Sequence, residues 1–159
     1  MMGFRLPGQI MKLNFEQKID ASLETVWAAF NNSSNKERWQ QNFESYKHST
    51  GDPGRPGAIS ELEFNENGKI MTVNETITEC REPVFLSASY KSKYASTIIV
   101  NHFESIGEDK TRWTSWCNFS FKGFMKIMAL FIAGTIGKRT EDDMHRFKLL
   151  VETDEAGRA

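Results

Sequence analysis

The residue best placed to do chemistry is Glu75, in a strand-like segment where apolar and polar residues alternate. Glu75 shares one face of this segment with Met71, Val73 and Ile77. If that face points inward, the carboxylate lies among apolar side chains, where it would act as a general acid or base, or anchor a ligand's hydroxyl or amine. The alternative is a twisted or rim position that leaves Glu75 solvated or paired with Lys or Arg, because charged side chains are seldom buried unpaired.

His102 is the second candidate catalytic residue. It alternates with Ile98 and Val100 and would place a second polar group on the inner face of its strand, whereas Ile99 and Phe103 occupy the opposite face. Both faces are apolar, so the sequence leaves open which one points inward. The alternative is a histidine that is exposed or held by structural partners.

The sequence predicts no metal or cofactor. His48, His102 and His145 lie on separate predicted elements, whereas a metal site needs its ligands close together. HExxH, GxSxG, CxxC and phosphate-binding glycine-rich motifs are absent. The charged run at residues 138–146 places opposite charges four residues apart, which predicts a solvated helix face.

The longest predicted element is a helix over residues 123–152, without proline. One apolar stripe continues along it at helical spacing: Met125, Ala129, Ile132, Ile136, Met144, Phe147 and Val151. The first half carries a second apolar face, formed by Phe124, Ile127, Met128 and Phe131. Three interpretations of this surplus face remain open: ordinary core, the lid of a cavity, or a contact with a membrane or partner.

Upstream of that helix, the pattern predicts one strand, two short helices and six further strands. Alternation marks the first strand at residues 13–19, and Ser22 is placed to cap the first short helix. Short links such as Asn67-Gly68 favour an antiparallel meander over residues 43–121. The predicted fold class is therefore α+β: a curved seven-stranded antiparallel sheet wrapped around a long C-terminal helix, with two short helices between strands 1 and 2.

The sequence resembles the START-like (SRPBCC) superfamily with the helix-grip fold, in particular its polyketide cyclase/dehydrase and lipid-transport group. The resemblance covers residues 12–152 and is carried by IDASLETVWAAFNNSSNKERW, GDPGRPGAISELEF, ETITECREPVFLSASY and the terminal FKLLVE. It implies a deep, largely apolar cavity between the concave face of the sheet and the long helix. Members bind lipids, polyketides, sterols, hormones or quinones, a minority catalyse cyclisation or dehydration, and a related branch activates chaperones.

The first functional hypothesis is therefore a small protein that binds a hydrophobic ligand such as a lipid or polyketide. The expected ligand-binding residues are Trp39, Leu62, Met71, Val73, Glu75, Tyr90, Trp113, Phe124, Met128 and Phe131. The second hypothesis is a cyclase or dehydratase that uses Glu75 and His102. The third is an interaction module, similar to the chaperone activators, that docks a partner on the surplus face.

Net charge, hydropathy and cysteine content limit the kinds of partner and the cellular compartment that we expect. A net charge of -1 gives no basic surplus, which argues against a nucleic-acid partner. The apolar run at residues 124–136 is shorter than the ~20 residues that cross a bilayer, so we expect no membrane span. Cys80 and Cys117 predict free thiols in a reducing, cytoplasmic setting, with a disulfide between strands as the alternative. We expect a flexible extension at residues 1–10 and a single domain at 11–155, and the sequence leaves monomer and homodimer open.

Overall fold

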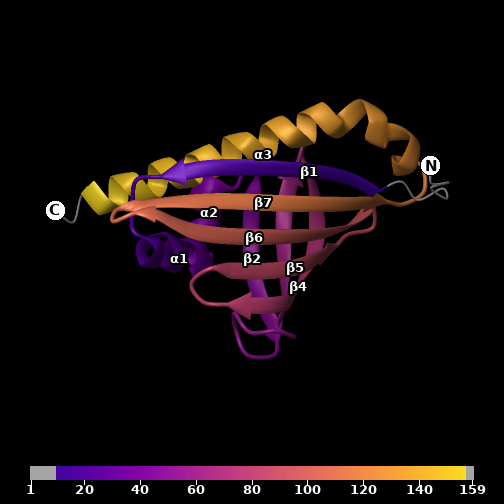
Figure 1. The fold of residues 1–159 in the computed structure, drawn as a ribbon. Helices are drawn as coiled ribbons and strands as arrows, with labels where there is room; N and C mark the ends of the chain where they lie inside the picture. Colours follow the sequence, from indigo (N-terminus) through magenta and orange to yellow (C-terminus); the bar gives the residue numbers. More distant parts are fainter. Residues whose placement is uncertain (1–9, 157–159) are drawn as a thin grey trace, which may run out of the picture.

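The computed structural model describes residues 10–156, and within them seven strands form one curved antiparallel sheet (Figure 1). The strands are β1 (Ile10–Ile19), β2 (Phe43–Thr50), β3 (Ile59–Glu66), β4 (Lys69–Arg81), β5 (Phe85–Lys91), β6 (Ala95–Gly107) and β7 (Lys110–Phe121). Their order across the sheet is β1-β7-β6-β5-β4-β3-β2. The predicted meander is thus confirmed, and β1 closes against β7 through pairs from Ile10–Ser120 to Ile19–Thr111.

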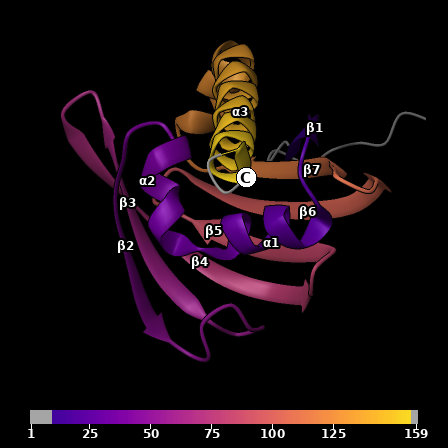
Figure 2. The same cartoon turned by 90° about the vertical axis from the view of Figure 1, so that its left-hand side faces the viewer.

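The helices occupy the concave side of the sheet. They are α1 (Leu23–Asn31), α2 (Lys36–Trp39), which follows a short 3-10 turn at Ser33–Asn35, and α3 (Met125–Ala156). Ser22 caps α1 as predicted, since its hydroxyl accepts a hydrogen bond from the Thr25 amide at 3.2 Å. Figure 2 shows α3 end-on in the opening of the curved sheet, with α1 and α2 closing one end. This arrangement is the helix-grip fold.

The turn between β3 and β4 shows how local sequence sets the register of the sheet. Asn67 and Gly68 both adopt positive φ, at 55° and 86°. Asn and Gly reach this region at low cost, which is why they form two-residue hairpin turns. The Asn65 side chain also accepts a hydrogen bond from the Gly68 amide at 2.8 Å. The turn fixes Leu62 opposite Val73, so the apolar residues of both strands share the concave face.

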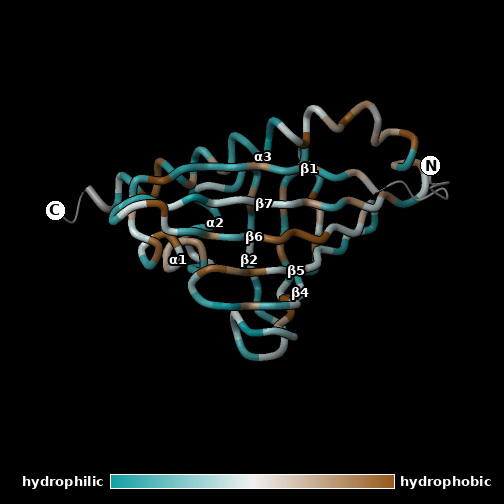
Figure 3. The backbone as a smooth tube through the Cα atoms, viewed as in Figure 1, coloured by the Kyte–Doolittle hydropathy of each residue, from teal (hydrophilic) through white to brown (hydrophobic). Residues whose placement is uncertain are grey.

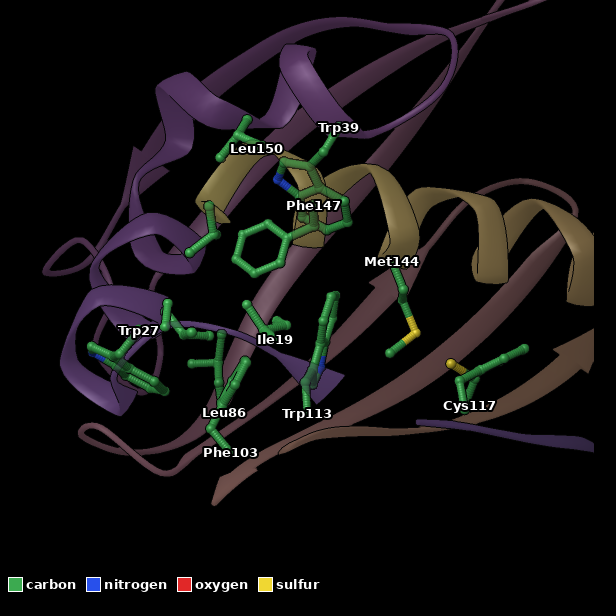
Figure 4. Packing of buried hydrophobic residues seen from close by; sticks show 14 of the residues in the cluster. Ile19, Trp27, Trp39, Leu86, Phe103, Trp113, Cys117, Met144, Phe147 and Leu150 are labelled. Carbon is green, nitrogen blue, oxygen red and sulfur yellow. The ribbon is translucent and has the colours of Figure 1, made fainter. Parts of the chain in front are cut away.

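An aromatic cluster fills the end of the sheet that α1 and α2 close (Figure 4). Its rings are Trp27, Phe30, Trp39, Phe103, Trp113 and Phe147, with neighbouring centroids 5.0–6.2 Å apart. Most pairs meet edge to face, the arrangement that aromatic quadrupoles favour. The core of the protein is therefore concentrated at one end of the curved sheet.

The two halves of α3 differ in how deeply their apolar side chains are buried. Met144, Phe147 and Val151 are at most 3% exposed, whereas Ile132 and Ile136 from the same predicted stripe are only half-buried. Figure 3 shows the corresponding change in hydropathy, with the more hydrophobic residues in the first half of the helix and the more hydrophilic ones in the second. The second half of α3 packs on the core, and the first half covers a less filled part of the sheet.

Three further expectations concern the chain as a whole. Residues 1–9 of the expected extension lie outside the described residues, and Ile10 already begins β1. No helix within residues 10–156 is long and apolar enough to cross a membrane. Cys80 and Cys117 are both free, as the favoured interpretation of the sequence expects.

Candidate ligand-binding cavity

A cavity of about 360 Å³ lies between the concave face of the sheet and α3. Its sheet wall is apolar and comes from β3, β4, β6 and β7: Leu62, Phe64, Met71, Val73, Ile99 and Phe119. Phe30, Trp39 and Trp113 form the end wall against the aromatic cluster, and Ile136, Thr140 and Met144 face the cavity from α3. Strand alternation explains the wall, because each of these strands places every second side chain on the concave face.

A second cavity of about 380 Å³ adjoins the first under the beginning of α3. The two share six lining residues: Met71, Val73, Tyr90, Thr97, Phe119 and Ile136. Tyr94, Phe121 and Met125 line only the second cavity, which therefore extends toward the β5–β6 turn and the start of α3. Together the two cavities form a continuous apolar hollow beneath the first half of the helix.

Tyr90 and Glu75 supply a polar group to this hollow. They pair directly across β4 and β5, and Glu75 is only 7% exposed. Tyr90 lines both cavities. Burial raises the pKa of the Tyr90 hydroxyl well above its usual value, and the charge of Glu75 and its hydrogen bond to Tyr90 raise that pKa further. The hydroxyl therefore stays protonated at neutral pH.

Three uncharged polar side chains of the hollow, Asn101, Trp113 and Ser115, have local partners, whereas the buried indole N–H of Trp39 has none among the described residues. The indole N–H of Trp113 donates to the Asn101 side-chain oxygen at 2.9 Å, and both residues are buried. Ser115 Oγ lies 3.8 Å from Cys117 Sγ. Burial raises the pKa of the Cys117 thiol, although its hydrogen bond with Ser115 acts in the opposite direction. These groups suit a largely apolar ligand with one or two hydroxyl or carbonyl groups.

A polar rim closes the side of the first cavity that lies near α2, and we define it as Gln41, Glu66, Arg139 and Asp143. Arg139 donates to Glu66 Oε1 at 2.6 Å and to the Gln41 carbonyl at 2.7 Å. The Gln41 amide and side chain donate to Asp143 Oδ1 at 3.1 and 2.9 Å. Burial raises the pKa of the Asp143 carboxyl even though the hydrogen bonds from Gln41 lower it. The rim ties α3 to the start of β2 and the end of β3.

The structure brings together six of the predicted ligand-binding residues on the walls of the cavities: Trp39, Leu62, Met71, Val73, Tyr90 and Trp113. Glu75 is buried beside Tyr90 but is not part of either wall. Phe124, Met128 and Phe131 do not line the cavities, and Phe124 and Phe131 are 71% and 76% exposed.

His102 lies on the other face of β6 from the cavity. Asn101 and Phe103 are buried on the concave face, so alternation places His102 on the convex face with Ile98, which is 49% exposed. Glu75 and His102 therefore do not face one cavity. Among the residues that the structure describes, no cluster of His, Cys, Asp and Glu side chains is arranged to hold a metal ion.

Sequence reasoning misses the rim residues. Helical spacing predicts a solvated face at residues 138–146 with Arg139 paired to Asp143; Lys138 and Asp142 do pair there, at 3.2 Å. For Arg139 and Asp143 the interpretation is wrong, because both line the cavity. Arg139 donates a hydrogen bond to Glu66, and Asp143 accepts one from Gln41. Position on the helix offers a signal, since Arg139 and Asp143 follow Ile136 and precede Phe147 at helical spacing on the inward side.

A curved antiparallel sheet that grips a long C-terminal helix over an apolar hollow defines the START-like, or SRPBCC, superfamily. Within it, the family model described as "Polyketide cyclase / dehydrase and lipid transport" matches residues 11–152, and the chain belongs to this family. No curated protein matches the sequence.

Several solved structures share the fold. The Zhui aromatase/cyclase from Streptomyces sp. R1128 superposes with a TM-score of 0.78 at 9% identity, covering 91% of this chain and 94% of that one. TTHA0849 from Thermus thermophilus gives 0.76 at 14% identity, covering 91% and 99%. Ara h 8.0201 gives 0.72 at 11% identity, covering 91% and 99%. At these identities the similarity establishes the fold alone.

Proposed function

We propose that this protein binds a small, mostly apolar molecule in the hollow beneath α3. The observation that carries the proposal is the hollow itself. Protein interiors are normally close-packed and keep few voids larger than a water molecule. Two adjoining cavities of about 360 and 380 Å³, each with an apolar wall, fall within the size range of small-molecule sites. Family membership supports a ligand-binding role for such a hollow.

The polar groups narrow the class of ligand. The neutral Tyr90 hydroxyl is the anchor: its proton is donated to Glu75, and its oxygen would accept a hydrogen bond from a ligand hydroxyl. Glu75 beside Tyr90 would repel a carboxylate or phosphate at this part of the hollow, whereas Lys36 and Arg139 line the first cavity near its rim. The ligand class is therefore a largely apolar, lipid-like or polyketide-like molecule that places a hydroxyl at Tyr90.

The first test is native mass spectrometry of the purified protein, compared with its denatured mass. An additional mass of a small molecule that is lost on denaturation would support the proposal and supply the ligand for identification. Because an expression host can lack the ligand, a second measurement uses the neutral fluorescent dye Nile red, which reports entry into an apolar site.

The matched variants are Ile99→Trp and Ile98→Trp, adjacent residues on β6. Ile99 lines the first cavity, whereas Ile98 lies on the outer face. The proposal expects the Ile99 variant to lose most dye binding, because the indole fills the cavity, and the Ile98 variant to keep it. Equal binding by both folded variants would place the dye elsewhere and would contradict the proposal.

A cyclase or dehydratase is the second candidate, and the burial of Glu75 beside Tyr90 is the observation in its favour. In this version His102 has no part, and the Tyr90 oxygen would accept a hydrogen bond from a substrate hydroxyl. Because Glu75 does not line the cavities, it would act on a substrate only through Tyr90. Turnover of a linear aromatic polyketide analogue, abolished by Tyr90→Phe with dye binding retained, would favour the enzyme over the carrier.

A further inference from the structure

Phe124, directly before α3, and the first turns of α3 expose large apolar side chains to solvent. Phe124, Ile127 and Phe131 are 71%, 63% and 76% exposed. They follow one another at intervals of three and four residues, so they form one stripe along the outside of the helix. An exposed apolar stripe of this kind on a soluble domain marks a surface that contacts another molecule.

Lysines flank this stripe, and the two sequence segments that carry them contain no acidic residue. Lys122 and Lys126 lie on the same segment, and Lys93 lies on the neighbouring β5–β6 turn. The sequence contains no Asp or Glu from Trp113 to Thr140, nor from Pro83 to Phe103. The protein as a whole has a net charge of -1, so the positive charge here is a local feature and not a general excess.

The β5–β6 turn and the start of α3 form one surface. The Lys122 amide donates to the Tyr94 carbonyl at 2.8 Å, and Lys122 Nζ donates to the Ser92 carbonyl at 3.1 Å. Tyr94 is 40% exposed beside Lys93, whose ammonium lies 5.0 Å from the Tyr94 ring centroid. We define the docking surface as the apolar stripe together with Lys93, Tyr94, Lys122 and Lys126.

Apolar side chains that project between lysines are the composition of interfacial, membrane-bound helices. The apolar groups enter the boundary between headgroups and acyl chains, and the lysines contact anionic headgroups. A second copy of this chain is a poorer occupant, because two-fold pairing of the surface on itself would bring lysines face to face. We propose that this end of the protein docks on anionic phospholipid bilayers.

The docking surface lies above one end of the hollow. Tyr94 and Met125 line the second cavity, and Tyr94 is also part of the docking surface, so the hollow reaches the point where the membrane would lie. This position would let an apolar ligand pass between bilayer and cavity. Docking itself is argued from the surface alone and does not depend on the proposed function.

The test is cosedimentation of the full chain with phosphatidylcholine vesicles, with and without phosphatidylglycerol. We expect binding to the anionic vesicles only. The double variant Phe124→Asp/Phe131→Asp should bind at least about 10-fold more weakly, since both apolar contacts are replaced by negative charge. Leu149→Asp is the matched control, because Leu149 is 48% exposed on the far half of the same helix.

The charge contribution is tested with Lys93→Gln/Lys126→Gln against Lys18→Gln/Lys47→Gln, which removes two exposed lysines outside the docking surface. Only the first pair should weaken binding, and the difference should shrink in high salt, where screening shortens to about 3 Å at 1 M. Absence of vesicle binding, equal binding by the Phe124/Phe131 variant, or a dimer that this variant dissociates would each overturn the proposal. The last outcome would identify a second copy as the occupant.

Discussion

Glu75 on β4 and Tyr90 on β5 lie directly opposite each other, and a side-chain hydrogen bond joins them. Tyr90 lines both cavities, whereas Glu75, which is 7% exposed, lines neither. Because burial and the Glu75 charge both raise the pKa of Tyr90, the hydroxyl is held in its neutral form where a ligand would meet it.

This pair predicts a particular sensitivity to alkali. Tyrosine in an unfolded chain ionises near pH 10, so above that pH the unfolded state loses the Tyr90 proton before the folded state does. Stability should therefore be intact below about pH 10 and fall as pH rises toward the raised pKa of the folded state. Urea unfolding from pH 8 to 11 should show a smaller alkaline loss in Tyr90→Phe than in the wild type.

Tyr94→Phe is the control for this measurement, since Tyr94 is 40% exposed at the β5–β6 turn. Glu75→Gln should also reduce the alkaline loss, because it removes the charge that opposes ionisation of Tyr90. Identical pH profiles for the Tyr90 variant and the wild type would mean that the buried pair does not govern the ionisation.

The rim predicts a second pH dependence of the same sign, at acidic pH, from the Asp143 carboxyl group. Burial raises the pKa of Asp143, so in the folded state it holds its proton to higher pH than the unfolded chain, where Asp ionises near pH 3.9. The stability that this shift contributes is complete below about pH 4 and is lost as pH rises through the folded-state pKa. Asp143→Asn should remove that loss and leave the protein no less stable at pH 7, measured by urea unfolding.

Asp143→Ala should behave differently. It leaves the Gln41 amide and side chain without their acceptor, at an expected cost of about 1–3 kcal/mol. Asp142→Asn is the matched control, because Asp142 is exposed on the adjacent position of the helix. Equal destabilisation by the Asn and Ala variants of Asp143 would show that the carboxylate charge itself is required.

The sequence predicts the fold because its signals are local. Two-residue alternation, the Ser22 cap and the Asn67-Gly68 turn each act over a few residues. Together they determine the order of the elements and favour an antiparallel meander. The cavity walls contributed by β3 and β4 follow from the same alternation. Alternation does not predict which face of β6 points toward the cavity, since apolar residues occur on both sides of that strand. The sequence also does not predict ion pairs between residues distant in sequence, such as Arg139 and Glu66, because helical spacing suggests Asp143 as a nearer partner for Arg139.

The surplus face of α3 illustrates a second limit. Periodicity shows that Phe124 and Phe131 share a face, but only the direction of the helix across the sheet decides whether that face is buried. Met125 and Ile136 face the second cavity, and the apolar stripe lies on the other side of the helix, where it is exposed to solvent.

The unequal packing of α3 predicts unequal costs of truncation. Phe147 is fully buried among aromatic rings, so Phe147→Ala should cost about 3–5 kcal/mol of unfolding free energy. Ile136 borders the hollow and is half-buried, so Ile136→Ala should cost less than about 2 kcal/mol. Denaturant unfolding of both variants checks the difference. A cost at position 136 equal to that at 147 would imply that the first half of the helix packs as tightly as the second.

The ion pair of Arg139 with Glu66 is expected to control access to the hollow more than stability. Its two side chains are 32% and 31% exposed, and partly exposed pairs contribute only about 0.2–1 kcal/mol. Yet Arg139 joins α3 to both Glu66 and the Gln41 carbonyl at the edge of the first cavity. Arg139→Ala should therefore change the unfolding free energy little and release Nile red several-fold faster in stopped-flow measurements, because the rim no longer holds the helix over the cavity. Lys138→Ala is the control, since its pair with Asp142 lies outside the cavity wall. An unchanged release rate in Arg139→Ala would mean that the dye leaves by the other end of the hollow, beneath Tyr94 and Met125.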